Sequence, residues 1–360
     1  MSEVAVARPE GDWPGHHSGV PAATWQAPDT RRMLQLALGA LWLLDAILQA
    51  QSVMFSRTFS HMLAGSAAGN PALVAHPISW SASLIAQHGM ATNAVFAAVQ
   101  LLLGLGIAGR RTVRVALAAS IVWSLAVWWL GEGLGGVLTP AASPVTGAPG
   151  AVIIYALLAV LLWPRDRASR PAPFVAARAV GAPAARVLWL LLWGSMAYLA
   201  VQPANRAPQA LASTISAMTT GEPGWLSAIG HGAAGLLAGQ GPLASALLAT
   251  ALAVVAIGVY LPRPAARGAV LLAVVLAVAT WVVGQALGGI LTGMGTDPGT
   301  GPLLVLLAAA YWPAAATADR PAAATPDGAA DATPDGARDK TETRGRGWPD
   351  RLGSRTASPR

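Results

Sequence analysis

The chain contains no cysteine, a single lysine, and charged side chains at only 11% of its 360 positions. The lack of cysteine excludes disulfide bonds, thiolate metal sites and CxxC redox centres. The scarcity of charge excludes a soluble protein, because a soluble chain of this length needs many more charged side chains to cover its surface. The sequence has no phosphate-binding loop motif, which excludes an ATP-driven pump. The bias toward arginine, alanine, glycine and proline is typical of a GC-rich bacterial genome.

The charge that is present lies mostly at the two ends of the chain. Residues 314–360 hold 8 of the 23 basic and 7 of the 16 acidic residues, whereas residues 31–313 carry only 14 basic and 5 acidic side chains. Hydrophobic residues make up 54% of the chain. We therefore predict an all-α polytopic membrane protein with disordered polar tails at 1–32 and 314–360.

Eight apolar runs are candidates for membrane-spanning helices, each of which needs about 20 apolar residues. The first run has no small-residue cleavage site behind it, so we expect a retained span rather than a signal peptide. The fourth and eighth runs are short. The runs are Met33–Ala50, Met90–Ala108, Val113–Leu130, Ala151–Trp163, Arg186–Val201, Pro242–Leu261, Gly268–Leu287 and Pro302–Trp312.

The basic residues indicate how these spans are oriented. With eight spans, 21 of the 23 basic residues fall on the same side as both termini, and only Arg57 and Arg206 fall on the other. The positive-inside rule places the richer side in the cytoplasm. We therefore expect a multi-pass protein of the bacterial cytoplasmic membrane with both termini cytoplasmic. The basic pI of about 10.9 then reflects topology, and no nucleic-acid partner is expected.

The chain contains an internal repeat. Residues 129–139 (WLGEGLGGVLT) match residues 282–292 (VVGQALGGILT) at an offset of 153. This predicts two four-span units, 33–164 and 186–313, joined by a basic cytoplasmic linker at 165–185. An even number of spans in each unit makes the two units parallel, related by an axis along the membrane normal.

The sequence does not decide the structure of two segments in each predicted unit. The Gly/Pro-rich stretches 131–150 and 284–301 precede the short fourth spans, and such a pattern marks either a transporter binding site or ordinary outer loops. The external segments after the first span of each unit have helical apolar spacing in their first part. We expect surface helices there, and their second parts (Leu73–Gln87 and Trp225–Gly239) could be re-entrant.

Polar side chains gather in the predicted outer half of the first unit only. The repeat supplies apolar or small residues at the matching places of the second unit, except for one glutamine, Gln285. A set present in one copy favours a function of that copy, because intramembrane ionisable groups are costly. Interhelical hydrogen bonding is the structural alternative. The candidate ligand-binding residues are Asp45, Gln49, His88, Asn93, Gln100 and Glu132.

Metal and cofactor sites have little support in the sequence. His61 and His76 lie in the external segment, and together with His88 and two carboxylates they could only form a site through the fold. Their spacing matches no local motif such as HExxH. We therefore predict no metal site and no evident cofactor.

The four-span unit resembles the DoxX-like group of small bacterial membrane proteins. The resemblance rests on the opening span Leu36-Ala-Leu-Gly-Ala-Leu-Trp-Leu-Leu-Asp45, on Phe55 and Phe59, and on residues 100–106 (QLLLGLG) before an arginine turn. It would make the chain a tandem duplication of that unit. The family includes a quinone-reducing thiosulfate oxidoreductase subunit, so the resemblance implies a quinone as cofactor, but it supplies no catalytic residues for this sequence.

Three classes of function follow from the sequence. The first is binding or transport of a small molecule through an outward-facing polar pocket of the first unit. The second is a quinone-linked membrane oxidoreductase or its accessory subunit, as the resemblance implies. The third is a non-catalytic assembly partner of another envelope protein. The expected partners are the lipid bilayer and either a small molecule or a membrane protein.

Overall fold

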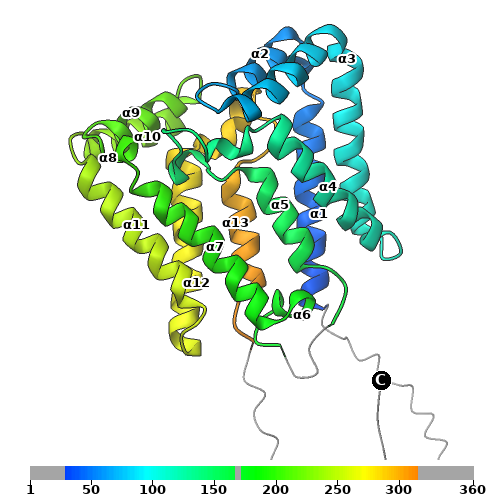
Figure 1. Cartoon of the computed structure of the whole chain (residues 1–360), viewed down its shortest axis with the longest axis vertical. Coiled ribbons are helices and arrows are strands. Elements are labelled where there is room, and N and C mark those ends of the chain that lie inside the picture. The colour runs from blue at the N-terminus through cyan, green and yellow to red at the C-terminus, as the bar shows by residue number, and fades with distance from the viewer. Residues whose placement is uncertain (1–28, 167–171, 315–360) are drawn as a thin grey trace, which may run out of the picture. The chain divides into compact units, whose positions relative to one another are not determined.

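A computed structural model describes residues 29–166 and 172–314 of the chain (Figure 1). The described residues form helices and connecting loops, with no strand among them, which confirms the all-α class. The predicted disordered tails lie outside the described residues apart from their inner ends. At one of these ends, α1 (Thr30–Gln49) begins three residues before the predicted run, because the Asp29 side chain caps it by accepting a hydrogen bond from the Arg31 amide at 3.2 Å.

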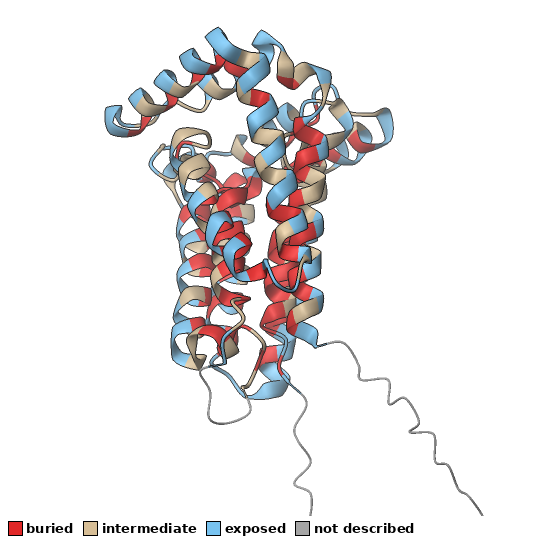
Figure 2. Cartoon of the chain, turned by 90° about the vertical axis from the view of Figure 1, so that its right-hand side faces the viewer, coloured by how far each residue is buried: buried red, intermediate tan, exposed pale blue. Residues whose placement is uncertain are grey.

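Six of the described helices are long and apolar enough to cross a membrane. Large apolar side chains such as Leu102, Val115 and Leu247 are exposed on their outward faces, whereas the inward faces are buried (Figure 2). This pattern is typical of helices that contact lipid, and it supports the membrane class. The six are α1, α3 (Ala72–Ala108), α4 (Val113–Leu130), α7 (Ala182–Ala200), α11 (Gly241–Gly258) and α12 (Arg263–Ala279), the last continuing through η4 (Thr280–Gly284).

Two shorter apolar helices, α5 (Ala151–Leu161) and α13 (Thr300–Ala310), lie where the sequence predicts fourth spans. Each follows an irregular Gly-rich segment that contains one or two turns of 3-10 helix. The remaining elements are short. They are η1 (Ser52–Phe55), α2 (Arg57–Gly65), η2 (Leu134–Gly136), η3 (Pro144–Thr146), α6 (Ala177–Val180), α8 (Pro203–Arg206), α9 (Ala210–Met218), α10 (Gly224–Leu237) and η5 (Ala286–Thr292).

The second part of each external segment is helical. In the first half of the chain it is the beginning of α3, a 37-residue helix that bends at His88, where the backbone leaves helical geometry (φ −129°, ψ 34°). In the second half α10 and α11 are separate helices, because Gly239 takes a positive φ of 79° between them. The first part of α3 packs on α2, and α10 packs on α9.

The two halves of the chain use the same helix neighbours. In the first half (29–166), α1 packs along α3, α3 along α4, and α4 along α5. In the second half (172–314), α7 packs along α11, α11 along α12, and α12 along α13. The halves meet where α13 contacts α5 and α1. A Cβ atom added to Gly104 would lie 2.9 Å from the Gly39 carbonyl oxygen, so α1 and α3 can approach closely only because both residues are glycine.

Aromatic side chains fill the centre of the bundle. Trp42 on α1 packs against Tyr155 on α5, with ring centroids 4.2 Å apart. Trp189 on α7 packs against both Trp193 and Tyr311, the residue that follows α13. All five side chains are fully buried, so this core connects the long helices with the two short ones.

An ionic cluster lies at the end of the bundle where α1 begins. Arg178 of α6 pairs with Asp29 at 2.7 Å and with Asp166 at 3.1 Å, and Asp166 also pairs with Arg31. These contacts connect the segment between the two halves to the first turn of α1. The two arginines lower the pKa of the exposed Asp166 carboxyl, chiefly through their hydrogen bonds to it.

Candidate functional site

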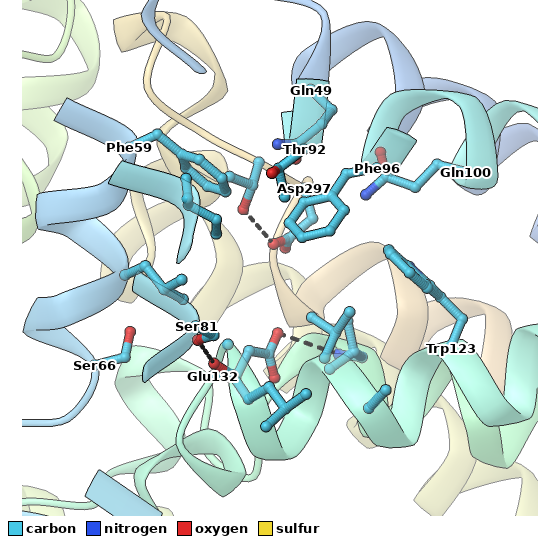
Figure 3. A pocket seen from close by; sticks show the side chains of 18 of the residues that line it. Gln49, Phe59, Ser66, Ser81, Thr92, Phe96, Gln100, Trp123, Glu132 and Asp297 are labelled. Carbon is cyan, nitrogen blue, oxygen red and sulfur yellow. Dashed lines mark hydrogen bonds between the residues drawn. The ribbon is translucent and has the colours of Figure 1, made fainter. Parts of the chain in front are cut away.

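A cavity of about 410 Å³ lies in the first half of the chain, between α1, α2, α3 and α4 (Figure 3). Its size is within the range of small-molecule sites, roughly 300–1,000 Å³. Aromatic and aliphatic side chains make up most of its wall, and the aromatic ones come from all four of these helices. They are Trp42, Phe59, Trp80, Phe96 and Trp123.

Four of the six predicted site residues line this cavity: Asp45, Gln49, Gln100 and Glu132. Asn93 is buried behind the wall, where its amide donates to the Gln49 carbonyl oxygen at 2.9 Å and its oxygen accepts from the Gln49 side chain. His88 lies at the bend of α3, is exposed, and does not line the cavity. The structure therefore brings together the predicted carboxylates and amides, but not the histidine.

A third carboxylate, Asp297, lines the cavity together with the neighbouring Thr296. It comes from the loop before α13 in the second half of the chain, and the cavity is therefore built from both halves. Asp297 is not among the predicted site residues, because nothing in the sequence indicates that a loop of one half reaches into the other. Its one available signal is rarity. Residues 31–313 contain only five acidic side chains, and three of them line this cavity.

Helix α1 places its polar residues by helical spacing. Trp42, Asp45 and Gln49 are three and four residues apart and therefore lie on one face of the helix. Trp42 fixes that face, since its indole N–H donates to the Ser120 hydroxyl of α4 at 3.1 Å. Asp45 is only 2% exposed, and its Oδ1 atom has no hydrogen-bond partner within the described residues.

Glu132 is held by the Gly-rich segment after α4. One of its oxygens, Oε1, accepts a hydrogen bond from the Val152 amide in the first turn of α5, at 3.4 Å. The first amides of a helix have no partner inside the helix, so a carboxylate or amide oxygen stabilises this end. Trp128 closes the segment by donating its indole N–H to the Pro149 carbonyl at 2.7 Å.

The second half contains the same arrangement with glutamine in place of glutamate. Gln285 accepts a hydrogen bond from the Thr300 amide at the start of α13, at 2.9 Å, and donates to the Thr300 hydroxyl at 2.8 Å. Trp281 donates to the Pro298 carbonyl at 2.6 Å, as Trp128 does to Pro149. The two segments therefore share a local structure and differ in the charge at one position.

The electrostatic environment of the loop carboxylates favours their protonated forms. Burial, together with the negative charge of Asp297, raises the pKa of Glu132 to about 8, against the opposing effect of the Val152 and Ala151 amides. Burial also raises the pKa of Asp297, although the Gly299 amide at 2.7 Å and the Thr296 hydroxyl at 3.1 Å stabilise its ionised form.

Several oxygen atoms facing this region are not satisfied by the protein. Glu132 Oε2 and Gln100 Oε1 are buried and, like Asp45 Oδ1, have no hydrogen-bond partner within residues 29–166 and 172–314. A buried acceptor without a partner costs roughly 1–3 kcal/mol. The arrangement is thus suited to a ligand that brings hydrogen-bond donors or positive charge.

The two histidines of the external segment that the sequence offers as metal ligands lie away from the cavity. His61 on α2 and His76 on α3 are both exposed, and neither lines the cavity. Within the part of the chain that the structure describes, no three His, Cys, Asp or Glu side chains gather closely enough to hold a metal ion.

No protein-family model matches this chain, and no curated protein or solved structure matches it either. The comparisons therefore give the resemblance to the DoxX-like group no support. The residues and geometry of the cavity are the basis for a functional proposal.

Proposed function

We propose that the chain is an eight-span membrane protein made of two parallel four-helix units, and that it binds a small molecule in an outward-facing cavity of the first unit. The single observation that carries the binding function is the convergence of three of the five acidic residues between 31 and 313 on one cavity. Carboxylates are costly inside a membrane protein, so their collection in a mainly apolar cavity is typical of a functional site.

A purely structural role explains only part of the polar set. Interhelical hydrogen bonding accounts for Gln49 and Asn93, which bond to each other across α1 and α3. It does not account for Gln100, which lines the cavity and whose buried side-chain oxygen has no partner among the described residues. A group that serves the fold is expected to be paired, because leaving it unpaired costs stability.

The two-unit architecture is supported by matched contacts. The Trp-to-Pro hydrogen bond and the hydrogen bond to the start of the short helix recur at Trp128 and Trp281 and at Glu132 and Gln285. The short helices α5 and α13 then serve as fourth spans, with the irregular segments before them completing the crossing.

The natural absence of cysteine makes the topology directly testable. Single cysteines replacing the exposed Ala68 and Thr220 should react with a membrane-impermeant maleimide added outside intact cells. A cysteine replacing the exposed Ala265 should react only after the membrane is opened. Labelling of all three from outside would contradict both the orientation and the positive-inside argument.

Binding is tested with aromatic probes of similar size and different charge. Tetraphenylphosphonium, tetraphenylborate and triphenylphosphine oxide are titrated against the full-length protein in lipid nanodiscs. Ala126 lines the cavity, and Ala126→Trp should fill it. The matched control is Ala279→Trp, at the repeat-related position of the second half, which is exposed. We expect at least one probe to bind wild type and Ala279→Trp at 1:1 stoichiometry but not Ala126→Trp. No binding, or binding unaffected by Ala126→Trp, would overturn the proposal.

A quinone-linked role is the second candidate. The observation that favours it is the aromatic and aliphatic wall, with Phe96 and Trp123 packed edge to face at 5.4 Å. Adding decylubiquinone to the same titration tests it. Binding of the quinone in preference to all three charged or polar probes, again lost in Ala126→Trp, would favour this role. The role as an assembly partner stays a prediction.

A further inference from the structure

We infer that the ligand of this cavity is an apolar organic cation, which is exchanged for a proton of the cavity carboxyl groups. This inference rests on the proposed function, since it names the class of molecule that the same site takes. It is carried by three features of the wall: its charge, its aromatic content and the shortage of ligands for a bare metal ion.

The charge of the wall is of one sign. Three carboxyl groups line the cavity, contributed by α1, by the segment after α4 and by the loop before α13. None of the described residues that line it is an arginine, lysine or histidine. The ion pairs of the described residues lie at the opposite end of the bundle, so no cation among these residues balances the carboxylates. A cationic ligand would supply the missing charge, whereas an anion would be repelled.

The aromatic content selects the kind of cation. Trp42, Phe96 and Trp123 face the same space as the carboxylates, and the face of an aromatic ring attracts cations, most strongly when they are poorly hydrated. A metal ion such as Ca²⁺ or Mg²⁺ needs six or more oxygen ligands. The mainly apolar wall does not offer such a set. Among the described residues, no three His, Cys, Asp or Glu side chains lie close enough together to bind a metal ion. The wall instead fits an ammonium or phosphonium group with an apolar body.

Proton exchange follows from the same groups. The titratable side chains that line this space are Asp45 from α1, Glu132 and Asp297. The Tyr155 hydroxyl from α5 lies next to Asp45. Before binding, a carboxyl O–H such as that of Glu132 reduces the negative charge of the buried site. When the cation enters, that O–H bond breaks, the proton passes to water, and the carboxylate pairs with the cation. The raised pKa of Glu132 agrees with this order of events. Binding should therefore weaken as the pH falls.

The decisive experiment compares tetraphenylphosphonium with tetraphenylborate, which have the same shape and opposite charge. Binding to full-length protein in nanodiscs is measured at pH 8.5 and pH 5.5, with Ala126→Trp as the background. We expect tetraphenylphosphonium to bind at least about tenfold more tightly than tetraphenylborate, and at least about tenfold more tightly at pH 8.5 than at pH 5.5. Proton release on binding should be seen at pH 7 in weak buffer.

Variants separate a role in binding from a role in the fold. Glu132→Gln and Asp297→Asn should each weaken tetraphenylphosphonium binding at least about tenfold and reduce proton release. Glu222→Gln, which removes a carboxylate outside the cavity, is the matched control and should bind like wild type. If Glu132→Gln fails to fold, Asp297→Asn gives the same test.

The outcomes distinguish this inference from the function on which it rests. Tighter binding of tetraphenylborate or triphenylphosphine oxide, lost in Ala126→Trp, would overturn the cation class and leave the binding function standing. Tetraphenylphosphonium binding that is independent of pH would overturn the exchange. The absence of any binding sensitive to Ala126→Trp would overturn both.

Discussion

Glu132 in the first half and Gln285 in the second occupy matching places between a long helix and a short one. Both accept a hydrogen bond from an amide in the first turn of the short helix, and both lie next to a tryptophan that donates to a proline carbonyl. Glutamine therefore suffices for this local structure. The negative charge at 132 is not needed to start α5, which is why we assign it to a ligand rather than to the fold.

The first long helices of the two halves, α1 and α7, differ in a similar way, since the first half carries polar residues where the second half does not. On α1 the residues following Trp42 on its face are Asp45 and Gln49, whereas on α7 Trp193 is followed by Met196 and Ala200. Met196 is 3% exposed and packs in the central core. The second half thus has a buried apolar side chain at the place of the cavity carboxylate Asp45. Only Asp297 of the second half is acidic and lines that cavity.

The largest effects should come from the glycines that the two halves share. A Cβ atom on Gly135 would overlap the Pro149 carbonyl oxygen, and one on Gly288 would lie 2.5 Å from the Pro298 carbonyl carbon. Both glycines also have positive φ. We expect Gly135→Ala and Gly288→Ala each to lower the free energy of unfolding by roughly 2–5 kcal/mol, from backbone strain and overlap together.

The neighbouring glycines are the controls for that prediction. Gly136 and Gly289 also have positive φ but no atom closer than 3.7 Å to the added Cβ. Their substitution by alanine should cost only about 1–2 kcal/mol. Thermal unfolding in detergent measures all four variants. If the first glycine of the pair gave the larger loss of stability in one half and the second glycine did so in the other, the two Gly-rich segments would not share one structure.

Exchanging the residue that distinguishes the halves should have opposite effects on stability. Gln285→Glu places a carboxylate at a position that is 5% exposed and removes the hydrogen bond donated to the Thr300 hydroxyl. We expect it to destabilise the protein by roughly 3 kcal/mol, whereas Glu132→Gln should unfold at or above the wild-type temperature. Equal stability of Gln285→Glu and wild type would show that the second half tolerates the charge as well.

The stability of the wild type should fall as the pH rises through the range between the unfolded and folded pKa values of Glu132. The unfolded side chain titrates near 4.5 and the folded one near 8, so unfolding releases a proton between these values. We expect a loss of roughly 3 kcal/mol between pH 5.5 and pH 8.5, seen as a lower melting temperature. Glu132→Gln should reduce this loss, and Asp297 should account for part of the remainder because burial raises its pKa as well.

The tryptophan contacts offer a smaller, symmetric test. Trp128→Phe and Trp281→Phe each remove the indole N–H that binds a proline carbonyl, at 2.7 and 2.6 Å. We expect each to cost about 1 kcal/mol, and the two values to agree closely, since the contacts are alike. A large effect in one half alone, measured by the same unfolding experiment, would indicate that the segments differ in more than the residue at 132.

The smallest effect should come from the ionic cluster between the halves. Arg178 pairs with Asp29 and Asp166, both of which are more than half exposed. We expect Arg178→Ala to lower stability by less than about 1 kcal/mol, and the effect to vanish in high salt. Tetraphenylphosphonium binding should be unchanged in this variant.

Features that depend on local composition could be predicted from the sequence. The apolar runs indicate the six long helices and both short ones, although α1 begins three residues before its run because the Asp29 side chain caps it. The spacing of Asp45 and Gln49 is that of two residues on one helix face, and both line the cavity. The repeat also points to Glu132 as the position where the halves differ.

The placement of the other site residues depends on contacts between segments that are far apart in the sequence. The bend at His88 directs that side chain outward, although its position close to Asn93 in the sequence suggested a shared site. Asp297 is separated from Asp45 by some 250 residues, and it joins the cavity only because α13 packs between α5 and α1. Contacts of this kind are set by tertiary packing, which a single sequence without matching relatives does not report.

The most direct test of the binding proposal is to locate a bound organic cation in the protein. Crystals grown with tetraphenylarsonium allow the arsenic to be found by its anomalous scattering. We predict one arsenic peak in the first half, between Asp45, Glu132 and Asp297, and none in the matching place between α7, α11 and α12. Peaks in the second half, or only on the outer faces of the helices, would contradict the claim that the acidic cavity is the binding site.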